Sequence, residues 1–145
     1  LENSNIWIDY AHTPDALNHA LSTLRAHYPE FSIRVIFGCG GDRDKGKRQI
    51  MGKIASENAD SIILTNDNPR GEDPQAIIDD ILAGTKVEND VQVILDRGDA
   101  ILSAIQNLGE KEALLIAGKG HETTQVIGSK THRFSDIKVA LNALN

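Results

Sequence analysis

Residues 33–70 read IRVIFGCGGDRDKGKRQIMGKIASENADSIILTNDNPR, and the fold class can be inferred from this segment. It contains two short apolar runs, separated by a segment whose apolar residues recur every three or four positions. Uninterrupted apolar runs predict strands that are covered on both faces, and the intervening spacing predicts an amphipathic helix. Strand, helix and strand in this order predict a right-handed crossover between parallel strands.

The same alternation continues on both sides of this segment. It predicts an α/β domain with a Rossmann-like, open, mainly parallel sheet and helices on both faces. A Gly128-Ser129 turn between residues 125–127 and 131–134 predicts a small C-terminal β-hairpin. The strands of the main sheet are expected at Ile6–Asp9, Ile33–Gly38, Ser61–Thr65, Val91–Leu95 and Ala113–Ala117.

Two helices have clear start signals. Thr13-Pro14-Asp15 combines an N-cap residue, a first-turn proline and a first-turn acid, and Ser135-Asp136 opens the last helix. Helical spacing also predicts which residues face the core. Two of these predicted faces are Ile50, Met51, Ile54 and Ala55, and Ile137, Ala140, Leu141 and Leu144.

Length, charge and cysteine content restrict the function classes. The 145 residues fit one domain, and the single cysteine, Cys39, cannot form an internal disulfide. A formal net charge of −6 argues against a nucleic-acid or anionic membrane surface, and no apolar run is long enough to span a bilayer. The N-terminus does not resemble a signal peptide, so we expect a cytoplasmic protein. Because the first strand begins at Ile6, we also expect a fragment cut at a domain boundary.

Polar segments follow four of the predicted strands. In open parallel sheets, ligands bind beyond the carboxyl ends of the strands, so these segments are expected to converge on one site. The first segment contains Asp9 and His12, which can meet a ribose or a phosphate. The alternative is that this segment is only a capped helix start, with His12 packed in the turn.

The second segment, residues 38–48, is rich in glycine and carries four cations between Arg43 and Arg48. Glycines allow close backbone approach, and the following helix N-terminus favours anions. The spacing is not that of a Walker A loop. The alternative is a solvated charge cluster, neutralised by Asp42 and Asp44.

The third segment is Thr65-Asn66-Asp67-Asn68-Pro69-Arg70. Pro69 stiffens the turn, Asp67 suits an ammonium group, and Arg70 suits a carboxylate, so the segment fits a zwitterion. A surface Asx turn is the alternative. The fourth segment is Gly118-Lys119-Gly120-His121-Glu122, in which glycines bring the backbone close and a cation, an imidazole and a carboxylate stand near one another. It lacks the further ligands that a zinc site needs.

Four motifs together resemble the C-terminal domain of the Mur ligases, and specifically of the members that add diaminopimelate. In sequence order they are DYAHTPDAL (9–17), FGCGGDRDKGKR (37–48), TNDNPR (65–70) and AGKGHE (117–122). The resemblance covers nearly the whole chain. Its most specific element is DNPR (67–70), because lysine-adding members generally depart from it at the arginine.

The resemblance implies a three-domain enzyme of which residues 1–145 are the third domain. A first domain binds UDP-N-acetylmuramoyl-L-alanyl-D-glutamate, and a central domain holds most of the ATP and Mg²⁺ contacts. ATP phosphorylates the D-glutamate carboxylate, and the amine of meso-diaminopimelate then displaces phosphate, which serves peptidoglycan synthesis. Because the central phosphate loop is absent from this sequence, we expect the isolated domain to be inactive.

The resemblance also implies residue roles. It assigns no catalytic group and no metal ligand to this domain. Asp9 and His12 match residues that close over ATP, and Lys45 is a weaker candidate for a phosphate contact. The alternatives are a lysine-adding or folylpolyglutamate-type ligase domain, or a stand-alone ligand-binding module. The residues that match the meso-diaminopimelate site are Arg43, Asp67, Asn68, Pro69, Arg70, Gly118 and Glu122.

Overall fold

The computed structural model describes residues 5–86 and 88–145 and has an α/β architecture. Five parallel strands form a sheet in the order β1-β5-β2-β3-β4, and a separate antiparallel pair forms the hairpin β6-β7. The strands are β1 (Ile6–Asp9), β2 (Ser32–Phe37), β3 (Ser61–Leu64), β4 (Asp90–Val93), β5 (Glu112–Ala117), β6 (Thr124–Ile127) and β7 (Lys130–Arg133). The helices are α1 (Pro14–His27), α2 (Gly46–Asn58), α3 (Pro74–Leu82), α4 (Arg97–Gln106) and α5 (Asp136–Leu144).

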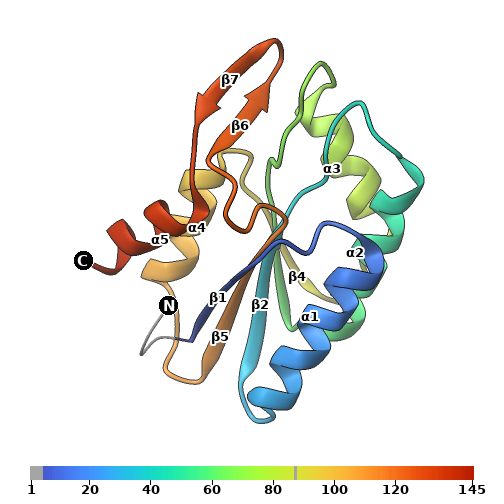
Figure 1. The fold of residues 1–145 in the computed structure, drawn as a ribbon. Coiled ribbons are helices and arrows are strands. Elements are labelled where there is room, and N and C mark those ends of the chain that lie inside the picture. The colour runs from blue at the N-terminus through green and yellow to red at the C-terminus, as the bar shows by residue number, and fades with distance from the viewer. Residues whose placement is uncertain (1–4, 87) are drawn as a thin grey trace.

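The sheet separates two apolar cores, because successive side chains of a strand point to opposite faces. Helices α1, α2 and α3 cover one face and bury alternate strand residues such as Val35 and Leu115. Helices α4 and α5 cover the other face and bury the intervening residues, such as Ile36 and Ile116. Figure 1 shows the two helical layers on either side of the sheet, with the hairpin projecting beyond one end. The predicted fold class is therefore confirmed.

The predicted strands are all present; β1 has the predicted bounds, and the bounds of the others differ by at most two residues. The largest difference is in β4, which is the edge strand Asp90–Val93 and not Val91–Leu95. The predicted caps are also present, since Thr13 Oγ1 accepts from Ala16 N at 3.2 Å and Ser135 Oγ accepts from Lys138 N at 3.3 Å.

Two predicted helix faces are partly wrong. On α2, Ile50 is 52% exposed, whereas Met51 and Gly52 are buried where the helix packs against α1 and α3. On α5, Leu141 and Leu144 point outward. Ala140 is buried as predicted, but the helix also buries Asp136, because an ion pair inside the protein fixes the rotation of its first turn.

The hairpin β6-β7 is attached to the segment that follows β3. Arg70 N donates to Val126 O at 3.0 Å, and Gly128 N donates to Arg70 O at 2.6 Å. These bonds form an isolated parallel bridge between Arg70 and Ile127. The hairpin thus stands directly beside the carboxyl ends of the strands. None of the helices in the described part of the chain is both long and apolar enough to cross a membrane.

Candidate functional site

A cavity of about 370 Å³ opens at the carboxyl ends of the strands, where the polar segments were expected to converge. It brings together six of the seven predicted amino-acid-site residues, all except Pro69, which is buried in the loop behind it. Among the predicted ATP-site residues it includes His12, but not Asp9 or Lys45. The lining residues are Tyr10, His12, Thr13, Gly38, Cys39, Gly40, Arg43, Lys47, Asp67, Asn68, Arg70, Gly118 and Glu122.

The loops after β2 and β3 form one wall of the cavity and pack directly against each other. A Cβ atom on Gly38 would lie 2.0 Å from Thr65 O, and one on Gly41 would lie 1.8 Å from Pro69 O, so both positions require glycine. Gly41 N donates to Asn68 O at 2.8 Å, and the Arg70 guanidinium donates back to Gly41 O at 3.0 Å.

The buried side chain of Arg48 anchors the glycine-rich loop after β2. Arg48 is fully buried and forms a bidentate pair with Glu72 at 2.6 and 2.9 Å, a second ion pair with Asp80 at 2.9 Å, and a hydrogen bond to Gly40 O at 3.0 Å. The hydrogen bonds from Arg48, helped by one from Asp42 N, lower the pKa of Glu72 to about 2 against the opposing effect of burial. The pair therefore stays ionised across the physiological range.

Arg70 occupies the left-handed backbone region, with φ at 53°. Few residues other than glycine adopt this conformation, and it costs of order 1 kcal/mol or more. The bridge to the hairpin and the bond to Gly41 O hold it in place. Arg43, on the opposite loop, is exposed and donates to Asp42 O at 2.9 Å. Two guanidinium groups thus line the cavity from adjacent loops.

Lys119 lies behind the side chains that line the cavity, and its own side chain is completely buried. Its Nζ lies 3.1 Å from Asp67 Oδ1, 3.8 Å from Glu122 Oε1 and 3.0 Å from Asn68 Oδ1. It also donates to Thr124 O at 3.0 Å. One ammonium group therefore contacts three of the side chains that line the cavity.

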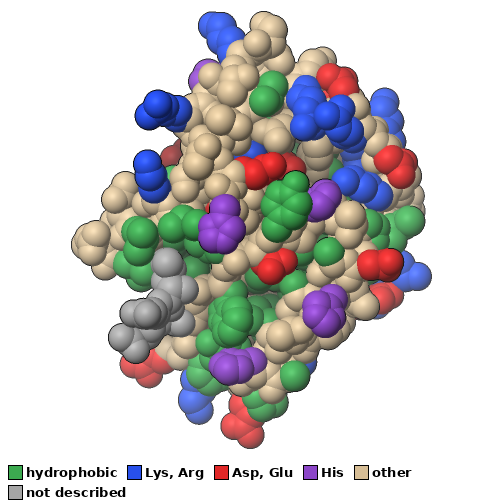
Figure 2. Space-filling model, viewed as in Figure 1, with side chains coloured by type: hydrophobic (Ala, Val, Ile, Leu, Met, Phe, Trp, Pro, Cys, Tyr) green, Lys and Arg blue, Asp and Glu red, His purple; other side chains and the backbone are tan. Residues whose placement is uncertain are grey.

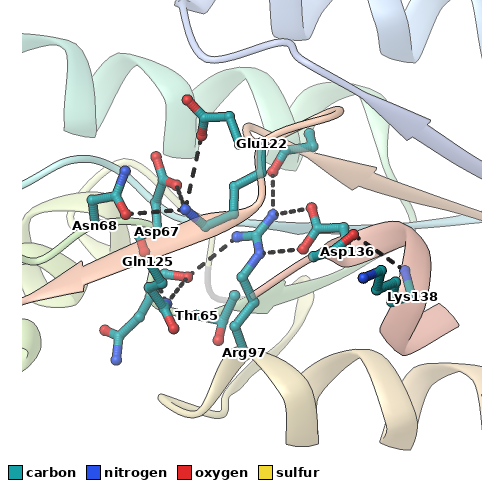
Figure 3. A network of polar contacts seen from close by, with 12 residues as sticks. Thr65, Asp67, Asn68, Arg97, Glu122, Gln125, Asp136 and Lys138 are labelled. Carbon is teal, nitrogen blue, oxygen red and sulfur yellow. Dashed lines mark hydrogen bonds and ion pairs between the residues drawn. The ribbon is translucent and has the colours of Figure 1, made fainter. Parts of the chain in front are cut away.

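A third buried cation, Arg97, supports the strand ends from the opposite face of the sheet (Figure 3). Its guanidinium forms a fully buried bidentate pair with Asp136 at 2.7 and 2.8 Å, and it donates to Asn66 O and Ala117 O. Burial alone would lower the pKa of Arg97, but the hydrogen bonds and charge of Asp136 outweigh it, so the pKa is raised. This arginine ties the ends of β3 and β5 to helix α5.

Asp9, the last residue of β1, and His12 shortly after it are both exposed, and their side chains bond locally. Asp9 Oδ2 accepts from Ala11 N at 2.9 Å, and His12 Nδ1 lies 3.1 Å from Tyr10 O. The Asp9 carboxylate borders a separate apolar hollow between β1 and α1. Lys45 precedes α2, is exposed and does not line the main cavity. Lys47 does line it, and its Nζ donates to His12 O at 3.0 Å.

Cys39 lines the cavity but is only 3% exposed, and its thiol lies 3.7 Å from Met51 Sδ. Burial raises the pKa of Cys39 to about 12, despite the nearby cations Lys47 and Arg48. The thiol is therefore protonated at neutral pH, which agrees with the absence of a nucleophile signature around it in the sequence.

The charges on the wall suit a ligand that carries both signs, since Arg43 and Arg70 are opposed by Asp67 and Glu122. Figure 2 shows Lys and Arg side chains around the upper part of this face, with acidic side chains between them. No cluster of three or more His, Cys, Asp or Glu side chains suited to a metal ion occurs within residues 5–86 and 88–145. The described residues do not fit a Mg²⁺ site of their own.

The model of the family described as "Mur ligase, glutamate ligase domain" matches residues 2–120 of this chain. The chain belongs to the Mur ligase family.

Several relatives share a name. A UDP-N-acetylmuramoyl-L-alanyl-D-glutamate–2,6-diaminopimelate ligase of Coxiella burnetii is 54% identical over 96% of this chain, and its namesake in Alkalilimnicola ehrlichii is 50% identical over 97%. A solved structure with that name superposes with a TM-score of 0.93 at 39% identity, covering 99% of this chain and 30% of the other. The chain spans 28% of the length of the two relatives.

More distant Mur ligases share the fold only. A murein peptide ligase from Psychrobacter arcticus superposes with a TM-score of 0.66 at 18% identity, over 97% of this chain and 28% of the other. Agreement at such low identity shows that the architecture is common to the family, whereas the charged wall must be examined residue by residue.

The sequence did not predict several of the residues that line the cavity of this Mur ligase domain. Tyr10 and Lys47 line the cavity but were not among the predicted site residues. The sequence indicates Lys119 as a member of the polar cluster after β5, but it does not indicate that the side chain is buried. The signal that could have identified it is its place between two glycines at the end of a wholly apolar strand, where a cation must find partners if the strand end is buried.

Proposed function

We propose that this chain is the C-terminal, amino-acid-binding domain of a three-domain ligase. The complete enzyme joins meso-diaminopimelate to UDP-N-acetylmuramoyl-L-alanyl-D-glutamate at the expense of ATP. ATP phosphorylates the D-glutamate carboxylate and leaves as ADP. The amine then attacks the acyl phosphate, forms the amide bond and releases inorganic phosphate. The support is the shared name of relatives about half identical to this chain, together with the charge pattern of the cavity.

The observation that carries the substrate assignment is the presence of two guanidinium and two carboxylate side chains on one cavity. Diaminopimelate differs from lysine by one additional carboxylate. We assign that group to Arg70 and Arg43, because a guanidinium binds a carboxylate through two parallel hydrogen bonds. With lysine, these arginines would lose their partner, at a cost on the order of 2–5 kcal/mol.

The remaining site residues take complementary roles in this proposal. Asp67 and Glu122 accept from a substrate ammonium group, Asn68 donates to a carboxylate, and Gly118 allows close backbone approach with its φ at 116°. Pro69 stiffens the loop. We propose that Asp9, His12 and Lys45 contact ATP when the rest of the enzyme closes over this domain. The contribution of this domain to the rate is then the positioning of the attacking amine.

The test is an amide-forming assay with the longer protein that contains this chain. Inorganic phosphate release is measured with UDP-N-acetylmuramoyl-L-alanyl-D-glutamate, ATP and either meso-diaminopimelate or L-lysine. We expect turnover with meso-diaminopimelate and a kcat/KM for lysine lower by a factor of about 30 or more. Equal use of lysine, or turnover with neither amino acid, would refute the assignment. Residues 1–145 alone are expected to release no phosphate.

A further inference from the structure

The buried Lys119 contacts three side chains that line the cavity, which a lysine with a purely structural role would not require. Its ammonium group is completely buried and contacts Asp67, Asn68 and Glu122, which come from two different loops. A buried ammonium group requires acceptors on all sides, and backbone carbonyls would satisfy it equally well. Three of its contacts are instead side chains that line the cavity, namely Asp67, Asn68 and Glu122, which are labelled in Figure 3.

The Asn68 carboxamide is fixed in one orientation by this arrangement. One of its two terminal atoms lies 3.0 Å from Lys119 Nζ and 2.9 Å from Val126 N. Both neighbours are donors only, so this atom must be the carbonyl oxygen. The NH2 group therefore occupies the other position. In the described part of the chain this NH2 group has no hydrogen-bond partner, and Asn68 lines the cavity.

We propose that Lys119 is a positioning residue of the amino-acid site: its ammonium group makes Asn68 a hydrogen-bond donor toward the ligand carboxylate and holds Asp67 and Glu122 as acceptors on the same wall. Lys119 itself stays behind the wall and does not touch the ligand. This inference rests on the proposed function, because it assumes that the cavity binds an amino acid.

The competing explanation is that Lys119 only stabilises the protein by joining the hairpin to the strand ends through Thr124 O. The two roles predict different kinetics. A structural lysine would weaken all ligands together when it is removed. A positioning lysine would selectively weaken the amino acid, and would do so through Asn68.

The experiment uses the longer protein that contains this chain, as wild type, Lys119→Met, Asn68→Ala and the double variant. We expect Lys119→Met to raise the KM for meso-diaminopimelate about 10–100-fold, with a nearly unchanged KM for ATP. In the Asn68→Ala background, Lys119→Met should raise this KM by a clearly smaller factor, because the carboxamide that Lys119 orients is already absent. Lys138→Met, on the exposed surface of α5, is the matched control and should change neither constant.

Asn68→Asp keeps the inference testable if Lys119→Met does not fold. This variant retains an acceptor for Lys119 and Val126 N and replaces only the NH2 group. We expect this variant to unfold at the same urea concentration as wild type and to lose at least about tenfold in meso-diaminopimelate affinity by calorimetry. Undiminished affinity of Asn68→Asp, fully additive effects in the cycle, or equal rises in both KM values would each overturn the inference. A wild-type enzyme that does not use meso-diaminopimelate would instead overturn the proposed function.

Discussion

The loop after β3 and the segment after β1 both end at the cavity, but they are held in different ways. The side chains and backbone of residues 66–70 bond to positions far away in the chain, including Gly41, Lys119 and Val126. Among the described residues, the side chains of Asp9 and His12 bond to backbone atoms two residues away. The long-range bonds of these two residues, from Gly118 N and Lys47 Nζ, reach their backbone carbonyls and leave the side chains without distant support. The first region belongs to the proposed amino-acid site and the second to the proposed ATP contacts.

This contrast indicates that the loop after β3, which belongs to the proposed amino-acid site, is preorganised by the fold. Two buried cations, Lys119 and Arg97, contact the loop after β3 from behind. A ligand that enters a preformed wall loses less binding energy to ordering of the protein. The exposed carboxylate and imidazole after β1 lack such support, so we expect contacts from the rest of the enzyme to orient them.

The largest expected effect comes from removing the support behind the preorganised loop. Asp136→Ala leaves the Arg97 guanidinium buried without its carboxylate, and such an uncompensated charge costs about 3–5 kcal/mol of unfolding free energy. Urea denaturation followed by circular dichroism measures this loss. Lys138→Ala on the same helix is exposed and should change the unfolding free energy by less than about 0.5 kcal/mol. A small effect of Asp136→Ala would show that the loop does not depend on this pair.

The next effect concerns the guanidinium that the preorganised loop presents. In the complete enzyme, Arg70→Ala should raise the KM for meso-diaminopimelate about 10–100-fold, because the distal carboxylate loses its charged partner. The KM for ATP should be almost unaffected. Steady-state phosphate release measures both constants, with Arg133→Ala on the exposed strand β7 as the control. Equal changes in both KM values would contradict the proposal that Arg70 binds the substrate carboxylate. They would also weaken the distinction between the loop after β3 and the segment after β1.

The ion pair under the glycine-rich loop gives a pH-dependent test of preorganisation. The pKa of Glu72 is lowered to about 2 in the folded protein, below its ordinary value. Its contribution is therefore complete above about pH 4.5 and is lost as the pH falls toward 2. Glu72→Gln should be less stable than wild type by on the order of 1–3 kcal/mol at pH 7.

The measurement is the difference in unfolding free energy between wild type and Glu72→Gln, followed from pH 7 to pH 2. This difference should remain constant down to about pH 4.5 and then shrink. A difference that grows on acidification would have the wrong sign for a carboxylate whose pKa is lowered. That result would argue against a preformed glycine-rich loop.

The smallest effect is expected at the locally held segment. Asp9→Ala removes one short-range hydrogen bond and a proposed ATP contact, so the KM for ATP should rise about 3–10-fold. The KM for meso-diaminopimelate should stay near the wild-type value. Asp15→Ala, in the first turn of α1, is a suitable control for the charge change. A defect confined to meso-diaminopimelate would place Asp9 in the other half of the site.

The candidate site could be predicted where the sequence places reactive groups directly after strands. Asp67, Arg70 and Glu122 were found this way, because parallel strands bring their carboxyl ends to one edge of the sheet. Their roles toward a ligand stay predictions. Tyr10 and Lys47 could not be found, since which neighbour of a strand end faces the cavity depends on how the loops pack.

Sequence alone determined the α/β class, the helix caps at Thr13 and Ser135 and the existence of the hairpin, because periodicity, capping and turn chemistry act between near neighbours. Tertiary packing, in contrast, sets the strand order, the rotation of α5 and the burial of Arg48, Arg97 and Lys119. A charged side chain is buried only where distant acceptors meet it, and no local pattern records that meeting. Helix α5 is an example: its apolar spacing predicted Leu141 and Leu144 in the core, but the buried pair of Arg97 and Asp136 turns the helix so that both leucines are exposed.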